Sequence, residues 1–544
     1  MSKRNFNIIN RTLYSVLETK TYGDIVFGCP PGIVKDFLKV KKSLPLKYVI
    51  PSQTFCNNIN NFDFEFIVYS VLFTKAPGST VSVYCLPEQE KRCRVILNET
   101  LFGPKFDQLL DSQSNKLLNE KCLNEDQRKK LQTLISKNIA KNKKISILFD
   151  NLLSAHSSES KTKKHIKQFI EDKILSKTPS IANTKITNLS NKLTKIYIQC
   201  AQLQKEFNLF SLAKERNRNS FISKIIKFHH IKKTGVHIIN GLKDKRKKIK
   251  IQEVESSVFK VIEGEEESYT IKLNSINSSK KKHRKKIFKT PFFGVTFIGV
   301  GSGFSVDKQN SSLIVWAEDK GILIDIIADN NLILSSYGIN NNAINHVFLT
   351  HIHSDHDAGA IENLLEEKKT YLITSRIIYE SFLRKAQALT SLSKNNIEKF
   401  VKLIEVIPKQ KIKIPGFTNT FFEFDYSLHS IPTGRCKITY SKGNTKKIIS
   451  HSGDTKYDIP KIDTWFDKGS FTQNRKNDLL GFIWDADLII HDVGGGILHT
   501  NYESLLHLDK KTKQKTVLVH QNEKPQTKSQ FRYAIDGETI SLIK

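Results

Sequence analysis

The sequence predicts an α/β protein of two or three domains, and three observations support that prediction. Short apolar runs with strand spacing alternate with segments of helical spacing, both near the N-terminus and after residue 292. Several of these runs end in a turn that carries histidine or aspartate. The chain has 544 residues, too many for one ordinary domain, so two or three are expected. Strands that alternate with short helices imply a mixed or parallel sheet covered by helices.

Composition excludes several classes of protein. Hydrophobic residues make up 39% of the chain, enough for real cores, and no apolar run is long enough to span a bilayer. The first residues have no apolar stretch after their positive charges, so a secretory signal is not expected. The 7 cysteines are odd in number and none has C-x-x-C spacing, which favours a reducing cytoplasm over a disulfide framework.

The chain is strongly basic. It has 86 Lys and Arg against 54 Asp and Glu, a formal net charge of +32. Such a surface attracts polyanions, nucleic acid first. Lys outnumbers Arg, and Asn and Ile are plentiful, so codon usage in an A/T-rich genome explains the charge equally well. The charge alone therefore does not decide whether the protein binds RNA.

Residues 1–104 predict a compact α/β unit. Strands are expected at 22–28, 47–51 and 81–85, with a short helix at 33–38. A similar order of strand, turn, helix and strand returns after residue 321. In the first copy, residues 51–56 read Pro-Ser-Gln-Thr-Phe-Cys and hold no His or Asp for a metal. We therefore predict a degenerate internal repeat that keeps the fold and lacks the site.

Residues 105–290 predict a Lys-rich middle region and linker. Apolar residues recur at helical spacing up to about residue 205. Basic runs lie at 228–250 and 280–286, and strand-like segments lie between them. We interpret the runs as solvated faces or linkers, with a phosphate-contacting arm as the alternative. A boundary near 285–291 is expected, so that residues 291–544 form the third unit.

Residues 350–357 are the richest stretch in metal-ligand types. They read Thr-His-Ile-His-Ser-Asp-His-Asp and follow an apolar run. A rigid strand that ends in such a turn can aim several side chains at one point, and imidazole with carboxylate suits zinc and similar ions. Three more residues of ligand type stand at or just after the ends of apolar strands: His429, Asp454 and His520.

These motifs resemble the metallo-β-lactamase fold and, within it, the zinc phosphodiesterases of the tRNase Z type. The match comprises the cluster at 350–356, His429, Ser-Gly-Asp-Thr at 452–455, and His520, with a strand and glycine-rich turn at 297–303. The resemblance covers about residues 292–544 and implies an αββα sandwich. No helix follows the glycine-rich turn, so a dinucleotide fingerprint does not fit. The first half resembles the long form of this group, in which an inactive copy precedes the active one.

The resemblance also implies the site. It suggests two zinc ions, with manganese as the other candidate, and seven ligands, three to each ion and one bridging both: His351, His353 and His429; Asp355, His356 and His520; Asp454. A hydroxide between the ions would attack phosphorus, and a histidine oriented by an acid would protonate the leaving oxygen. Asp355, already expected as a ligand, is also expected to be catalytic, together with His499 and Asp492. Ser302 and Asn310 are expected to bind the substrate, and Asp325 is expected to support the ligands from behind.

The sequence departs from that group at several positions. Lys308-Gln309 precedes Asn310 where an arginine is common, Asp492 replaces a glutamate, and Ile326 replaces a glycine. Neither half shows a clear Gly/Pro-rich arm for gripping tRNA. These differences leave hydrolysis intact and weaken tRNA as the substrate.

Three functions are consistent with these features. The first is a cytoplasmic RNA endonuclease that trims tRNA 3′ ends. The alternative is a phosphodiesterase for a cyclic nucleotide or another small diester. The third is a non-catalytic scaffold that binds RNA or protein. The expected partners are accordingly RNA, in particular a tRNA precursor, or a nucleotide. No membrane is expected, and a homodimer is left open.

Overall fold

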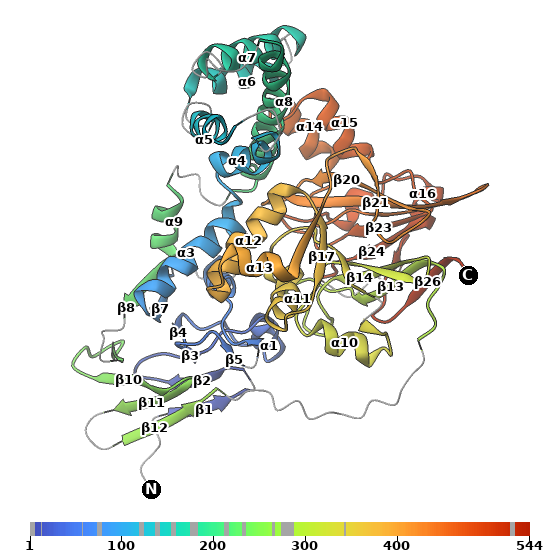
Figure 1. Cartoon of the computed structure of the whole chain (residues 1–544). Helices are drawn as coiled ribbons and strands as arrows, with labels where there is room; N and C mark the ends of the chain where they lie inside the picture. The colour runs from blue at the N-terminus through green and yellow to red at the C-terminus, as the bar shows by residue number, and fades with distance from the viewer. Residues whose placement is uncertain are drawn as a thin grey trace.

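The structure is a computed structural model (Figure 1). It describes residues 6–11, 13–56, 58–72, 79–118, 124–135, 142–153, 159–174, 183–211, 217–230, 235–263, 267–273, 288–341, 344–522 and 528–544. Within these ranges no helix is both long and apolar enough to cross a membrane.

The C-terminal half folds as two seven-stranded sheets. The first has the order β18-β17-β16-β15-β14-β13-β26: β13 (Phe293–Gly299), β14 (Ser312–Ala317), β15 (Lys320–Ile324), β16 (His346–Phe348), β17 (Thr370–Thr374), β18 (Val401–Glu405) and β26 (Thr539–Ile543). The second runs from β19 to β25 in chain order: β19 (Lys411–Lys413), β20 (Thr420–Ser427), β21 (Thr433–Lys442), β22 (Thr445–His451), β23 (Leu488–Asp492), β24 (Thr516–Val519) and β25 (Arg532–Tyr533). Phe348 of the first sheet packs edge-on against Phe422 of the second, with ring centroids 5.0 Å apart, so the core lies between the sheets.

Helices cover both sheets. They are α10 (Asn330–Ser336), α11 (Ser354–Leu365), α12 (Arg376–Thr390), α13 (Lys394–Phe400), α14 (Ile459–Asp467), α15 (Gln473–Gly481), η5 (Tyr502–Leu505) and α16 (Lys510–Lys515). α11 and α12 contact the first sheet at β17. α15 is tied to β21 of the second sheet by Arg435, whose Nη1 donates to the carbonyl of Leu479 at 3.2 Å. This arrangement is the αββα sandwich that the sequence predicted.

The N-terminal sheet repeats the strand order of the first C-terminal sheet. It comprises β1 (Phe6–Asn10), β2 (Ser15–Thr19), β3 (Ile25–Phe27), β4 (Lys47–Val49), β7 (Val81–Cys85) and β8 (Ile226–His230). Along this sheet the first two pairings are antiparallel and the next three are parallel. The pairings from β13 to β18 follow the same series. This agreement supports the predicted internal repeat, and it places residues 51–56 where the second half has its ligand cluster.

The remaining elements of the N-terminal half complete a second sandwich. Its helices and short strands are α1 (Ile33–Lys39), β5 (Phe55–Cys56), β6 (Ile59–Asn60), η1 (Phe66–Val68), α2 (Tyr69–Leu72), α3 (Pro87–Phe102) and α9 (Arg218–Ile225). A four-stranded sheet covers its other face: β9 (Val236–Asn240), β10 (Lys248–Glu255), β11 (Val258–Glu263) and β12 (Glu267–Lys272). Phe27 and Phe259 meet between these two sheets at 5.1 Å between ring centroids.

A bundle of helices interrupts the N-terminal repeat between α3 and α9 (Figure 1). It comprises α4 (Phe106–Leu118), α5 (Glu125–Leu134), α6 (Lys143–Leu153), α7 (Glu159–Ile174) and α8 (Asn183–Asn208). The predicted helical character of this region is confirmed. The sixth strand of the repeat, β8, returns only after the bundle, so the sheet extends beyond residue 104. The domain division at residues 104 and 290 stays a prediction.

The first basic run belongs largely to strands. On β10 the side chains of Lys248 and Lys250 are exposed, whereas those of Ile249 and Ile251 are buried. The alternation shows that the lysines line the solvent face of a sheet, as one of the two interpretations expected. Lys232 and Lys233, and the second basic run at 280–286, lie outside the described residues.

Candidate metal centre

Strand direction explains why ligands far apart in the sequence meet. β20 and β22 both pair antiparallel with β21, and β22, β23 and β24 pair parallel with one another in turn. These four strands therefore run the same way, and their carboxyl ends share one edge. His429, Asp454 and His520 follow β20, β22 and β24 at that edge. The turn after β16 brings the cluster at 350–357 to the same place.

The expected ligands gather in two groups. His351, His353 and His429 form the first: His353 Nδ1 lies 3.0 Å from His351 Nε2 and 3.4 Å from His429 Nε2. Asp355, His356 and His520 form the second, with Asp355 Oδ2 at 3.6 Å from His356 Nε2 and 3.8 Å from His520 Nε2. Each group has three ligand atoms within reach of one ion.

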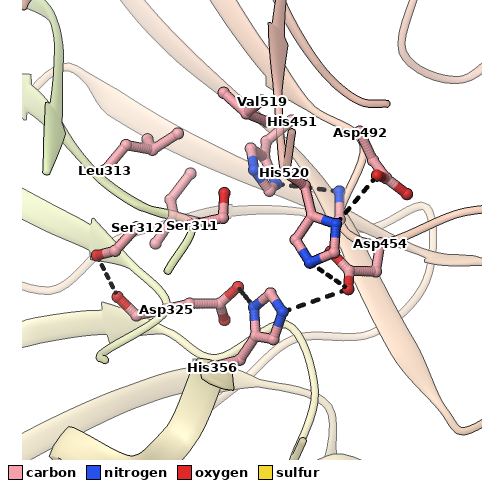
Figure 2. A pocket seen from close by; sticks show the side chains of 12 residues that line it. Ser311, Ser312, Leu313, Asp325, His356, His451, Asp454, Asp492, Val519 and His520 are labelled. Atoms are coloured by element: carbon pink, nitrogen blue, oxygen red, sulfur yellow. Dashed lines mark hydrogen bonds and ion pairs between the residues drawn. The ribbon is translucent and has the colours of Figure 1, made fainter. Parts of the chain in front are cut away.

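Asp454 lies between the two groups. Its Oδ2 is 3.7 Å from His351 Nε2 in the first group. In the second group it is 3.2 Å from His356 Nε2 and 3.5 Å from His520 Nε2 (Figure 2). A carboxylate in this position can contact an ion in either group, and the bridging role expected of Asp454 stays a prediction.

The outer ring nitrogens of the histidines are held by oxygens. His353 Nε2 lies 3.0 Å from the carbonyl of Thr100, and His351 Nδ1 lies 2.8 Å from the hydroxyl of Thr350. His356 Nδ1 lies 2.8 Å from Asp325 Oδ2. A ring nitrogen that donates outward leaves the other nitrogen unprotonated and facing inward. The tautomers that these contacts favour are those that metal ligation needs.

Two inward ring nitrogens lie beside carboxylates but form no hydrogen bond with them. The Nε2 atoms of His356 and His520 are buried and form no hydrogen bond within the described part of the chain. Buried polar atoms are rarely left in this state, and a cation would satisfy both. Together with the facing nitrogens of the first group, these orphaned atoms fit a pair of divalent metal ions. The identity of the metal does not follow from this geometry.

The pKa values of the histidines in the cluster agree with binding of metal ions. Burial lowers the pKa of His351 and His429 well below the usual value, so both rings are neutral. Burial acts in the same sense on His356 and His520, but carboxylates, Asp454 first, outweigh it and raise the pKa of both rings, that of His520 to about 10. The second group thus attracts positive charge, which metal ions would provide.

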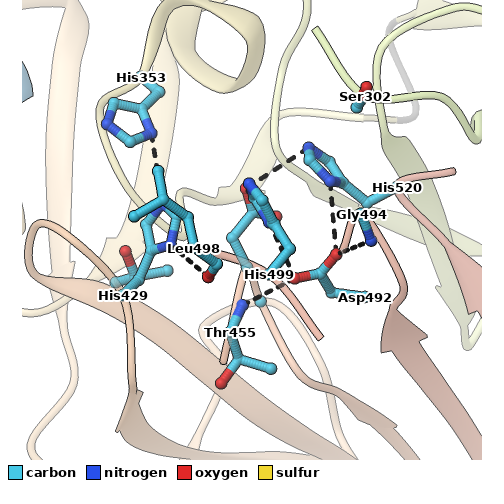
Figure 3. A network of polar contacts seen from close by, with 12 residues as sticks. Ser302, His353, His429, Thr455, Asp492, Gly494, Leu498, His499 and His520 are labelled. Atoms are coloured by element: carbon cyan, nitrogen blue, oxygen red, sulfur yellow. Dashed lines mark hydrogen bonds and ion pairs between the residues drawn. The ribbon is translucent and has the colours of Figure 1, made fainter. Parts of the chain in front are cut away.

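His499 and Asp492 form a pair beside the ligands. His499 Nδ1 lies 3.0 Å from Asp492 Oδ2, and the same oxygen accepts a hydrogen bond from the backbone N–H of Thr455 at 2.9 Å (Figure 3). Gly494 allows this packing, because a Cβ there would lie 2.9 Å from Cγ of His499. The contact fixes the His499 ring and leaves its Nε2 as the nitrogen that can face a substrate.

The glycine-rich turn lies against the second group. A Cβ on Gly303 would lie 2.9 Å from Asp355 Oδ2, so glycine permits this close approach. The Ser302 hydroxyl bonds to Asn522 and accepts from the N–H of Phe304 at 3.1 Å, and Asn310 pairs with Gly301 through the backbone. Both residues therefore lie in the loop beside the site, and their role in substrate binding stays a prediction.

Two sandwiched sheets with helices outside, and ligands at the strand ends of one edge, decide the fold. The C-terminal half has the metallo-β-lactamase fold. Asp325 lies against the outer nitrogen of His356, and its role in supporting metal binding stays a prediction; Ile326 stands where a glycine was expected. The contacts from Thr100 and Thr350 were not foreseen: Thr350 directly precedes the ligand cluster, whereas nothing in the sequence around Thr100 indicates its role.

Comparison with known proteins gives one family model and two relatives. A family model described as "Anti-Pycsar protein Apyc1" matches residues 293–536. The cAMP/cGMP-dependent 3′,5′-cAMP/cGMP phosphodiesterase B of Dictyostelium discoideum is 27% identical over 527 residues, 94% of this chain and 44% of that protein. The cGMP-dependent 3′,5′-cGMP phosphodiesterase A of the same organism is 31% identical over 283 residues, 49% of this chain and 32% of that protein. The chain thus spans less than half the length of either relative.

A solved structure of human tRNase Z, short form, is similar to part of this chain. It covers 46% of this chain and 99% of its own, at 15% identity and a TM-score of 0.33.

Proposed function

We propose that the chain is a metal-dependent phosphodiesterase that hydrolyses 3′,5′-cyclic nucleotides. The observation that carries the proposal is the set of inward-facing ligand atoms around Asp454 Oδ2, with the His499–Asp492 pair beside it. The names of the two relatives favour a cyclic nucleotide over an RNA. The alternative that the sequence left open thereby becomes the main hypothesis, and tRNA processing becomes the second.

The arrangement suits hydrolysis of a phosphodiester. Two divalent ions, zinc or manganese, would supply an activated water and neutralise charge on the phosphoryl oxygens. Water adds to phosphorus, one ribose P–O bond breaks, and the leaving oxygen takes up one proton. His499, held at Nδ1 by Asp492, is placed to give that proton from its other ring nitrogen. Asp355 acts here as a ligand that holds the second group together.

RNA cleavage keeps one supporting observation, the formal net charge of +32. Positive charge strengthens contact with any polyanion and does not select RNA. Cytoplasmic location and a homodimer stay predictions, as does the role of the basic faces.

One assay compares the substrates directly. The purified full chain is stripped with a chelator, reloaded with Zn²⁺ or Mn²⁺, and incubated with 3′,5′-cAMP, 3′,5′-cGMP and a precursor tRNA. We expect nucleoside monophosphate from at least one cyclic nucleotide, none before reloading, and little from His351→Ala. His507→Ala serves as the matched control, because His507 is an exposed histidine that contacts the carbonyl of Ser504 and the ring of Tyr457 and is not among the expected ligands. Cleavage of tRNA without turnover of either cyclic nucleotide would reverse the order of the two hypotheses.

A further inference from the structure

The helix that carries two of the ligands lacks a capping side chain of its own. α11 begins at Ser354, and its N-cap residue, His353, makes no side-chain capping bond. The His353 ring is instead turned toward His351 and His429. The first N–H groups of a helix have no partner within it, so they need one from elsewhere.

The missing cap comes from the N-terminal half. Glu65 Oε2 accepts hydrogen bonds from the backbone N–H of Ser354 at 3.1 Å and from its hydroxyl at 3.0 Å. Both residues are only 1% exposed. A carboxylate at a helix N-terminus is favoured by the helix dipole, and burial strengthens the contact.

The same carboxylate is part of a buried network behind the ligand turn. Lys385 of α12 lies 3.7 Å from Glu65 Oε2 and donates to Asp357 Oδ1 at 2.7 Å. Its ammonium also donates to the carbonyl of Ile352, which stands between two of the ligands, at 2.8 Å. Glu65 therefore balances the charge that holds the backbone of the turn in place.

The other oxygen of Glu65 reaches toward the glycine-rich turn. Oε1 accepts from the hydroxyl of Tyr69 at 2.7 Å, and the Tyr69 ring packs on Phe304 with centroids 5.6 Å apart. Phe304 directly follows Gly303, which lies against Asp355. One side chain thus connects the ligand helix and the loop beside it.

We infer that Glu65 is a positioning residue of the metal centre, supplied by the half of the chain whose described residues form no metal-ligand group. It lies between β4 and β7, the segment that corresponds in the repeat to the ligand turn and α11 between β16 and β17. The N-terminal half therefore acts as an internal partner that completes the site. This inference rests on the metal site of the proposed function and not on its substrate.

Metal affinity of the full chain tests this role. Zn²⁺ binding is measured by competition with a chromophoric chelator, alongside thermal unfolding, for the wild type, Glu65→Gln and Glu65→Asp. Because residues behind metal ligands typically contribute 10–100-fold to affinity, we expect Glu65→Gln to lose about 10-fold or more and Glu65→Asp to lose less.

Glu206→Gln is the matched control. Glu206 is also a buried glutamate that joins another part of the chain to the C-terminal half, through Arg475, without contact to the ligand turn. We expect it to lower the melting temperature and leave Zn²⁺ affinity within about twofold.

Equal Zn²⁺ affinities for wild type and Glu65→Gln, or equal losses in Glu65→Gln and Glu206→Gln, would overturn the inference. If Glu65→Gln does not fold, Glu65→Asp is judged by the same comparison. Wild-type protein that binds Zn²⁺ but hydrolyses no cyclic nucleotide would count against the proposed function alone, whereas wild-type protein that binds neither Zn²⁺ nor Mn²⁺ would refute both.

Discussion

Asp325 holds His356 from behind: its Oδ2 accepts from Nδ1 of that ring at 2.8 Å, and the same oxygen accepts from the Thr350 hydroxyl at 2.8 Å. Its Oδ1 accepts from the backbone N–H of Thr350 at 2.8 Å. Asp325 itself has a left-handed backbone, with φ of 56°, which is strained for any residue except glycine. A strained aspartate that fixes one ligand and the start of the ligand cluster is expected to matter for metal binding more than for folding.

Asp325→Asn should therefore weaken metal binding. The amide can still accept one bond, but it loses the negative charge that orients His356, so Zn²⁺ affinity should fall by about 10–100-fold. Competition with a chelator measures the change. Asp329→Asn, in the same loop but outside the ligand cluster, is the control. A wild-type affinity in Asp325→Asn would show that His356 is oriented without this contact.

His499→Asn should lower turnover without releasing metal. General acids typically contribute about 10²–10⁴-fold, and the loss should appear in kcat for a cyclic nucleotide. A diester with a nitrophenolate leaving group needs no proton on departure, so its hydrolysis should be affected far less. Metal content is measured beside both rates. Equal losses for the two substrates would remove His499 from the role of proton donor.

The ligand cluster could be predicted because each ligand follows a short apolar strand, a pattern visible in the sequence alone. The predicted strands at 47–51 and 81–85 correspond to β4 and β7, and the helix at 33–38 corresponds to α1. Asp492 and His499 were found only through resemblance to a known fold. The structure places them 3.0 Å apart, although no periodicity indicates this pairing.

Other features depend on contacts between distant segments. Glu65 is separated from Ser354 by most of the chain, and no local pattern marks a glutamate that will cap a remote helix. β8 was not predicted, because the helical bundle separates it in the sequence from β7, its partner in the sheet. In the basic run at 228–250, the alternation of exposed lysines with buried isoleucines, such as Lys248 and Ile249, is hard to recognise because so many residues are charged.

The pH dependence of stability should include one buried histidine of the N-terminal half. Burial, aided by His229, lowers the pKa of His237 to about 4, and its ring packs edge-on against Tyr84. An unfolded histidine titrates near 6.5, so between about pH 6.5 and pH 4 the unfolded chain binds more protons. The stability that His237 contributes as a neutral ring is therefore complete above pH 6.5 and is lost as the pH falls through this window.

His237→Phe should flatten that response. Melting temperatures at pH 7.5 and pH 5 should differ by several degrees less in the variant than in the wild type, because phenylalanine does not titrate. His165→Gln changes an exposed histidine of α7 and should keep the wild-type difference. Parallel curves for wild type and His237→Phe would assign the acid sensitivity to other groups.

Docking of the helical bundle should depend on one buried ion network. Glu206 of α8 accepts two hydrogen bonds from Arg475, each at 2.7 Å, and Arg475 also pairs with Asp425 at 2.9 Å. Removing one partner of a buried pair leaves a charge without its counterion and costs about 3–5 kcal/mol. Glu206→Ala should therefore destabilise the chain by that order in urea unfolding and expose the bundle to limited proteolysis.

Glu125→Ala is the control. It breaks the exposed pair with Lys129 on α5 and should cost under about 1 kcal/mol. If the two variants unfold alike, apolar packing of the bundle, and not this network, holds it in place.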